Sequence, residues 1–170
     1  MQEFDLIQKY FSKISNKHAL SLNDDVFFDK RKGLVISIDT YNLGYHFLNF
    51  KRPDLVIKKI IRSSISDLIC KGVIPKFYFI SGSGNKNSFS RKNLFKISQS
   101  LKQEQRKYGI SLCGGDTTFS NALSFSVTSV GYSKKIIYRN NVKPNDNIYV
   151  TGNLGDSFIG LQILKKKNYF

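Results

Sequence analysis

The pattern of hydrophobic and polar residues predicts helices mixed with short strands. Apolar residues that recur every three or four positions predict helices over residues 3–14, 53–69, 90–108 and 155–165. Short apolar or alternating runs predict strands at residues 26–28, 34–38, 77–80, 122–131 and 148–150. No regular strand–helix–strand rhythm is visible. We therefore predict an α+β fold, with a mixed or antiparallel sheet and helices on one face.

Local signals mark the ends of two of these helices. Pro53 occupies an early helical position, where proline is favoured, and Gly72 is placed to end the same helix. Ser90 is a typical residue for the start of the next helix. The stretch 81–88 is rich in Ser, Gly and Asn but lacks the Lys and hydroxyl ending of a phosphate loop, so it is predicted to be a flexible connection.

Size and composition indicate a globular protein. The chain has 170 residues, of which 41% are hydrophobic and 14% aromatic, and no apolar run approaches the roughly 18 residues of a membrane span. The acidic N-terminal residues do not resemble a secretory signal. Cys70 and Cys113 form neither a disulfide framework nor a CxxC metal motif, so a reducing, cytoplasmic location is expected.

The charge is strongly basic, with 27 Lys and Arg against 12 Asp and Glu, a net charge of +15. Such a surplus is compatible with binding to nucleic acid. However, the lysines are scattered, and the densest run, 165–167, ends a predicted helix, where cations are favourable in any case. A nucleic-acid partner is therefore not predicted.

A glycine-rich motif at 113–118 carries the first sign of chemistry. Gly114 and Gly115 allow a sharp turn or a close approach to a ligand, and Asp116 follows with two threonines. Such oxygen groups suit a hard cation such as Mg²⁺ together with phosphate oxygens. The motif is predicted to be a tight loop between strands, and the alternative is an ordinary turn that contains an Asp.

Ten of the twelve acidic residues are Asp, and four apolar elements each deliver one at an edge. The four segments are Asn23-Asp24-Asp25, Ser37-Ile38-Asp39-Thr40, Ser64-Ile65-Ser66-Asp67 and Gly114-Gly115-Asp116-Thr117. If the fold gathers these carboxylates, their mutual repulsion requires divalent cations. Mg²⁺ that bridges nucleotide phosphates is the commonest purpose of such a cluster.

These segments, in this order, resemble the thiamine-monophosphate kinase family, which belongs to the superfamily of aminoimidazole-ribonucleotide synthetase-like, ATP-using enzymes. Nearly the whole chain shares the resemblance. Further matching segments are Glu3-Phe4, His46-Phe47, Arg139, Ile148-Tyr149-Val150-Thr151-Gly152 and Leu154-Gly155-Asp156-Ser157.

The resemblance implies that the γ-phosphate of ATP passes to thiamine monophosphate, which gives thiamine diphosphate. It also implies roles for individual residues, with ATP as co-substrate and Mg²⁺ as cofactor. The magnesium positions are Asp25, Ser37, Ile38 (through its backbone), Asp39, Asp67 and Asp116; the ATP-contacting positions are Gly115, Asp116 and Arg139; His46 falls on the substrate-contacting histidine. No residue is assigned a catalytic role beyond binding metal and phosphate.

The chain departs from the family pattern at several positions. Ser21 and Asn23 replace two glycines before the paired aspartates, Ser64 replaces an Asn, and Phe119 replaces an Arg. The family also has a second domain of similar size. We therefore expect residues 1–150 to be an N-terminal domain that binds ATP and Mg²⁺ and dimerises, with 151–170 as the start of a C-terminal domain missing from this chain. The resemblance implies a homodimer closed by a β-barrel.

Plainer interpretations of these residues remain open. The aspartates are also typical of turns, His46 is compatible with a structural histidine, and Arg139 with a surface charge. The alternative functions are a superfamily member that uses ATP on another substrate, and a truncated module without catalysis that dimerises or binds RNA.

Overall fold

The computed structural model of the chain describes residues 2–140 and 142–166. It divides the chain into two compact units, Met1–Arg139 and Asn140–Phe170. The first unit contains a five-stranded sheet with its helices, and the second contains one helix, α4 (Asp156–Lys166). All the site residues predicted above therefore belong to the first unit.

The sheet has the strand order β1-β2-β5-β3-β4. The strands are β1 (Phe27–Asp29), β2 (Leu34–Asn42), β3 (Ile74–Gly84), β4 (Ser111–Phe119) and β5 (Ser124–Tyr132). Neighbouring strands are antiparallel except β3 and β4, which are parallel. The sheet is thus mixed, as predicted.

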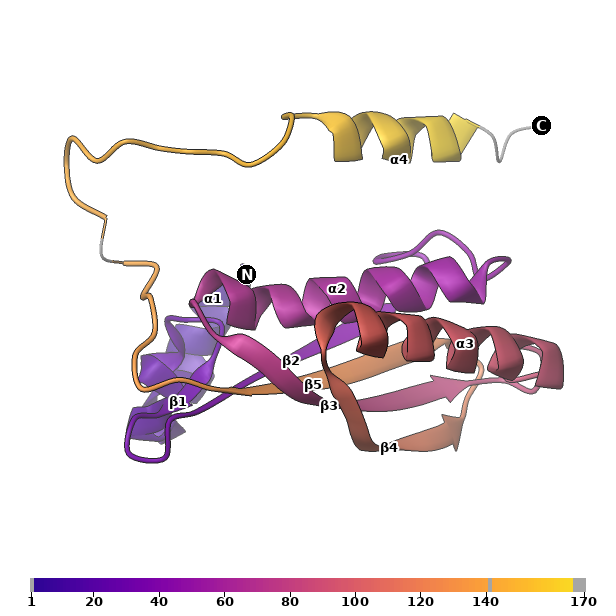
Figure 1. The fold of residues 1–170 in the computed structure, drawn as a ribbon, viewed down its shortest axis with the longest axis horizontal. Coiled ribbons are helices and arrows are strands. Elements are labelled where there is room, and N and C mark those ends of the chain that lie inside the picture. Colours follow the sequence, from indigo (N-terminus) through magenta and orange to yellow (C-terminus); the bar gives the residue numbers. More distant parts are fainter. Residues whose placement is uncertain (1, 141, 167–170) are drawn as a thin grey trace. The chain divides into compact units, whose positions relative to one another are not determined.

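Two long helices, α2 (Pro53–Cys70) and α3 (Arg91–Tyr108), lie on one face of this sheet (Figure 1). Their apolar residues pack against the inward-facing residues of β2, β3 and β5 and form the main core. Ile57, Ile61 and Leu68 of α2 are fully buried, and so is Val127 of β5. This packing confirms the α+β fold with helices on one face.

The predicted ends of α2 and α3 agree with the structure. Pro53 is the first residue of α2, and Gly72 follows its end with φ +72°, a left-handed conformation that favours glycine. Ser90 precedes α3 in an extended conformation, although its side chain makes no capping hydrogen bond. The N-terminal segment is less regular, since a short α-helix, α1 (Glu3–Leu6), continues as π-helical and 3₁₀ turns.

Three predictions about loops and strands were wrong. The stretch 81–84 continues β3 and pairs with both β4 and β5, and the turn begins only at Asn85, whose side chain accepts backbone N–H groups of Asn87 and Ser88. The glycine-rich motif is not a tight loop but lies within β4. Residues 148–150 form no strand with any part of the chain that the structure describes.

The sheet face turned away from α2 and α3 carries exposed apolar side chains, and we call it the open face. Cross-strand partners on it form the rows Leu34–Tyr132–Ile74, Ile36–Val130–Phe77 and Ile38–Thr128–Phe79. Ile38 is 70% exposed and Phe79 41%. Among the described helices, none is both long and apolar enough to cross a membrane.

Candidate functional site

A cleft of about 510 Å³ gathers most of the predicted site residues of the first unit. Its lining comprises Glu3, Phe4, Ile7, Phe11, Leu22, Asp24, Asp25, Ile38, Asp39, Asp67 and Arg139. Three separate segments thus bring Asp25, Asp39 and Asp67 to one place. Ser37 lies beside them, since its hydroxyl donates a hydrogen bond of 2.8 Å to Oδ2 of Asp67.

The alternation of β2 explains how Ser37 and Asp39 reach this cleft. Val35, Ser37, Asp39 and Tyr41 face α2, whereas Ile38 points to the open face. Asp67 comes from the last turns of α2, which packs across this end of β2. Ile38 lines the cleft although its side chain points to the open face, and a contribution of its backbone to metal binding stays a prediction.

Burial and like charge both oppose ionisation in the cleft. Burial raises the pKa of Asp67 above its ordinary value, and the nearby carboxylates of Asp39 and Asp25 raise it further. The pKa of Asp39 is also raised, chiefly by burial, although the hydroxyl of Tyr41, which donates to Oδ2 at 3.1 Å, opposes the shift. The site is therefore short of positive charge around Asp39 and Asp67.

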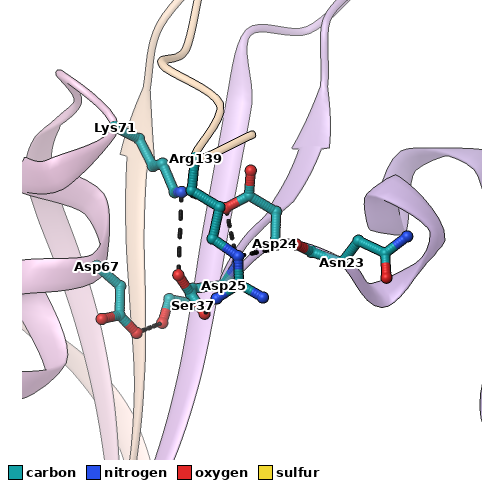
Figure 2. A network of polar contacts seen from close by, with 7 residues as sticks. All are labelled: Asn23, Asp24, Asp25, Ser37, Asp67, Lys71 and Arg139. Atoms are coloured by element: carbon teal, nitrogen blue, oxygen red, sulfur yellow. Dashed lines mark hydrogen bonds and ion pairs between the residues drawn. The ribbon is translucent and has the colours of Figure 1, made fainter. Parts of the chain in front are cut away.

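A second group of carboxylates is paired with protein cations (Figure 2). The Lys71 ammonium contacts Oδ1 of Asp24 and lies 3.9 Å from Oδ2 of Asp25. Nη1 of Arg139 donates to the other oxygen of Asp25 at 3.1 Å, and its Nε donates to the Asn23 carbonyl at 3.0 Å. Asp25 thus lies between two cations.

The segment that leads into the paired aspartates is strained. Leu20, Ser21 and Leu22 all have positive φ angles, between 52° and 56°, which residues other than glycine seldom adopt. The resemblance described above implies a glycine in place of Ser21, and glycine would adopt this conformation without strain. Asn23, at the other such position, has φ −98° and needs no such freedom.

His46 lies in the turn after β2, outside the lining of this cleft. Its Nδ1 accepts the backbone N–H of Asn42 at 2.9 Å, so in the neutral ring the proton is on Nε2. The Tyr41 ring packs edge-on against the imidazole at 5.7 Å, and the Tyr41 hydroxyl reaches Asp39. Tyr41 therefore connects His46 with the acidic cleft.

Gly115 and Asp116 do not join the other predicted residues. They lie in β4, at the opposite edge of the sheet from β1, and the register aligns Asp116 with Ser81, Ser126 and Thr40. Three strand spacings, about 14 Å, therefore separate Asp116 from β2. Gly115 approaches β3 closely, since a Cβ there would lie 1.8 Å from the Ile80 carbonyl oxygen.

The sequence interpretation missed two residues of the site, Lys71 and Tyr41. Lysine is common near the end of a helix, and an aromatic residue in a strand is ordinary, so neither carried a signal. Asp24 was noted only as the neighbour of Asp25. Its side chain is in fact almost fully buried against Lys71.

The donor chemistry of the cleft fits Mg²⁺. Carboxylate and hydroxyl oxygens of Asp25, Ser37, Asp39 and Asp67 are hard ligands of the kind that Mg²⁺ prefers. Among the described residues, no group of three or more carboxylate, imidazole or thiol side chains is arranged so that it could hold a metal ion, so these side chains alone form an incomplete ligand set. An incomplete set suits a cation that keeps several waters and shares phosphate oxygens.

The chain is similar to known proteins over nearly its whole length. Thiamine-monophosphate kinase of Buchnera aphidicola (subsp. Schizaphis graminum) is 35% identical over 98% of this chain, and that of Haemophilus influenzae is 35% identical over 99%; each match covers 53% of the relative. The solved structure of AaThiL complexed with AMPPCP and TMP matches 97% of this chain and 53% of its own, with a TM-score of 0.86 and 28% identity. The chain thus spans about half the length of the curated relatives it matches.

A protein-family model matches the part of the sequence that forms the sheet and the helices α2 and α3. The model of the AIR synthase related protein N-terminal domain matches residues 22–133, which is more than half of the chain and includes Asp25, Asp39 and Asp67. The resemblance seen in the sequence motifs is confirmed at this level. The chain therefore belongs to the AIR synthase related protein family and carries its N-terminal domain.

Proposed function

We propose that this chain is the metal- and nucleotide-binding part of an ATP-dependent thiamine-monophosphate kinase. The observation that carries the proposal is the convergence of Asp25, Asp39 and Asp67 in one cleft with Arg139. The relatives named thiamine-monophosphate kinase, and a similar structure that holds AMPPCP and TMP, support it. A cytoplasmic location is part of the same proposal.

In this proposal, Asp25, Ser37, Asp39 and Asp67 hold magnesium, together with the Ile38 backbone. Bound magnesium would neutralise phosphate charge and align the two phosphates during transfer. Burial, together with the neighbouring carboxylates, raises the pKa values of Asp39 and Asp67, and a bound cation would offset this cost. Arg139, whose guanidinium is about half exposed, binds ATP phosphate.

His46 binds the phosphorylated substrate in the same proposal. The hydrogen bond from Asn42 to Nδ1 leaves Nε2–H as a donor, and the imidazole is exposed. A phosphate oxygen is a suitable acceptor for this group. Tyr41 contacts both His46 and Asp39, and this supports the proposal because phosphoryl transfer requires the two phosphates to lie close together.

Gly115 and Asp116 require a second copy of the chain in this account. Asp116 shares the open face with Ile38 and Phe79 by register, and the outer edge of β4 is unpaired within the described residues. A homodimer that packs the open faces together and closes a β-barrel would bury the exposed apolar rows. It would also bring β4 of one copy toward the β1–β2 edge of the other, where Asp116 and Gly115 could bind metal and ATP.

Binding of the ATP analogue AMPPCP tests the proposal on the chain itself. Calorimetric titration is expected to show binding that depends on Mg²⁺ and is lost in Asp67→Asn. Conversion of thiamine monophosphate to thiamine diphosphate, followed by mass spectrometry, tests the activity in the longest protein that the gene encodes. Salt-sensitive RNA binding without Mg²⁺-dependent nucleotide binding would instead support the module without catalysis. Turnover of a different phosphorylated or carboxylated substrate would support another superfamily activity.

A further inference from the structure

Lys71 is a buried cation inside the acidic site. It follows directly after α2, and only 4% of its side chain is exposed. Both backbone polar groups of Lys71 are hydrogen-bonded: its N–H donates to the Leu68 carbonyl, and its carbonyl accepts the N–H of Ile137. The ammonium therefore cannot withdraw into solvent without a rearrangement of the end of α2.

The main partner of Lys71 is as buried as Lys71 itself. The Asp24 side chain is 5% exposed and contacts the ammonium through Oδ1. A buried ion pair of this kind is tolerated only while both partners remain, because an isolated buried charge is strongly unfavourable. The Lys71–Asp24 pair is thus a fixed charge arrangement, which sets the field felt by its neighbours.

The neighbour that matters is Asp25. Its Oδ2 lies 3.9 Å from the Lys71 ammonium, and its side chain is 48% exposed toward the cleft. Its second cation, Arg139, is 42% exposed and held by surface contacts, so it is free to exchange with solvent or a ligand. Lys71 is buried, and any cation that binds Asp25 must do so beside its ammonium group.

We propose that Lys71 is a positioning residue whose buried ammonium holds the Asp24–Asp25 pair in place and weakens the binding of a divalent cation at Asp25. The inference rests on the proposed function, which makes Asp25 a magnesium ligand. Lys71 supplies part of the positive charge that the carboxylates need. The segment therefore keeps its structure without metal, and magnesium binds less tightly than the number of carboxylates suggests.

Charge and packing make different predictions for two single variants. Lys71→Met removes a positive charge and leaves Asp24 unpaired, so Mg²⁺ affinity is expected to rise about tenfold. Asp24→Asn removes a negative charge and frees Lys71 to pair with Asp25, so affinity is expected to fall about tenfold. A purely structural role would disturb the site in both variants and shift the affinity in the same direction.

The test is calorimetric titration of Mg²⁺ into the 170-residue chain and its variants. The double variant Lys71→Met with Asp24→Asn restores the charge balance, so its affinity is expected to be close to that of the wild type. Lys71→Arg keeps the charge and is expected to behave likewise. Lys102→Met, an exposed position on α3, is the matched control for the loss of one positive charge. Its affinity is expected to remain unchanged.

The possible results separate this inference from the proposed function. If the wild type binds Mg²⁺ but Lys71→Met binds it no better than Lys102→Met does, the inference about Lys71 is wrong and the metal site stands. Folded wild-type chain that binds no Mg²⁺ at millimolar concentration overturns both. If Lys71→Met does not fold without metal, Asp24→Asn decides the matter. Unchanged or tighter Mg²⁺ binding by Asp24→Asn contradicts the role of Lys71.

Discussion

Replacing Asp67 with Asn is expected to stabilise the metal-free chain while removing its response to magnesium. The Asp67 carboxylate is partly buried, and burial together with the charges of Asp39 and Asp25 raises its pKa. An amide of the same size carries no charge, and its oxygen can still accept the hydrogen bond from Ser37, now 2.8 Å long. The variant therefore loses the cost of a partly buried charge and keeps the hydrogen bond from Ser37.

The sign of the pH dependence follows from the raised pKa. Between the ordinary value of 3.8 and the higher value in the folded chain, the native state binds more protons than the unfolded state. Wild-type stability therefore falls as the pH rises through this window, and the fall is absent in Asp67→Asn. Near neutral pH the free energy of unfolding of the variant is expected to be higher by about 1 kcal/mol. For a unit of this size, that difference corresponds to a thermal unfolding midpoint about 4 °C higher.

The assay is urea unfolding at pH 4, 5.5 and 7, with EDTA and then with Mg²⁺. The stability difference is expected to be small at pH 4 and to grow toward pH 7. Added Mg²⁺ at about ten times its dissociation constant is expected to stabilise the wild type by about 1.4 kcal/mol and the variant hardly at all.

Asp54→Asn is the matched control on the same helix. Hydrogen bonds from Arg52 lower the pKa of Asp54, so its loss is expected to destabilise the chain slightly at neutral pH, with no effect on the Mg²⁺ response. If Asp67→Asn is less stable than the wild type at pH 7, or if its advantage does not change with pH, the conclusion that burial and neighbouring carboxylates disfavour the charge of Asp67 is refuted.

Three further changes test other parts of the account. Ser21→Gly relieves a φ of +56° and is expected to stabilise the chain by about 1 kcal/mol in chemical denaturation; an unchanged midpoint would contradict strain at this position. Arg62→Met leaves the carboxylate of Glu104, whose side chain is 2% exposed, without its bidentate partner. The free energy of unfolding is expected to fall by about 3 kcal/mol in the same measurement. A loss below about 1 kcal/mol would refute the importance of this ion pair between α2 and α3. Phe79→Glu places a charge on the open face and is expected to convert a dimer into a monomer in sedimentation velocity; a dimer that survives the change would exclude the open face as the interface.

The resemblance to the kinase family, and not local pattern, singled out Ser37, Asp39 and Asp67, but local patterns explain why the fold brings them together. The alternation along β2 determines that Ser37 and Asp39 share one face, and the helical period of α2 determines where Asp67 projects. Once α2 packs on β2, Ser37 can donate its hydrogen bond to Asp67, and Asp39 and Asp67 come to line the same cleft. The helix ends at Pro53 and Gly72 were likewise readable from conformational preference alone.

The glycine-rich motif shows where local reasoning fails. Gly114 and Gly115 favour a turn by composition, but pairing with β3 draws the segment into the edge strand β4. The glycine at 115 is required there because the β3 backbone approaches too closely for a Cβ. Tertiary pairing thus overrides local preference, as is common in strands.

Lys71 was unpredictable for a different reason. Its neighbours in the sequence give an ordinary helix end, and its burial is created by Asp24, which lies 47 positions earlier. The separation of Asp116 from the cleft is equally invisible in a linear motif, because it depends on the order of strands in the sheet. Both features are determined by topology and not by local sequence.

The central claim is that Asp25, Asp39 and Asp67 together bind a divalent cation against nucleotide phosphates. Electron paramagnetic resonance of Mn²⁺ bound to the chain, with and without AMPPCP, measures this directly. We predict that the chain binds Mn²⁺, that the nucleotide tightens the binding, and that replacing all three aspartates with Asn abolishes it. Undiminished Mn²⁺ binding by the triple variant would contradict the account.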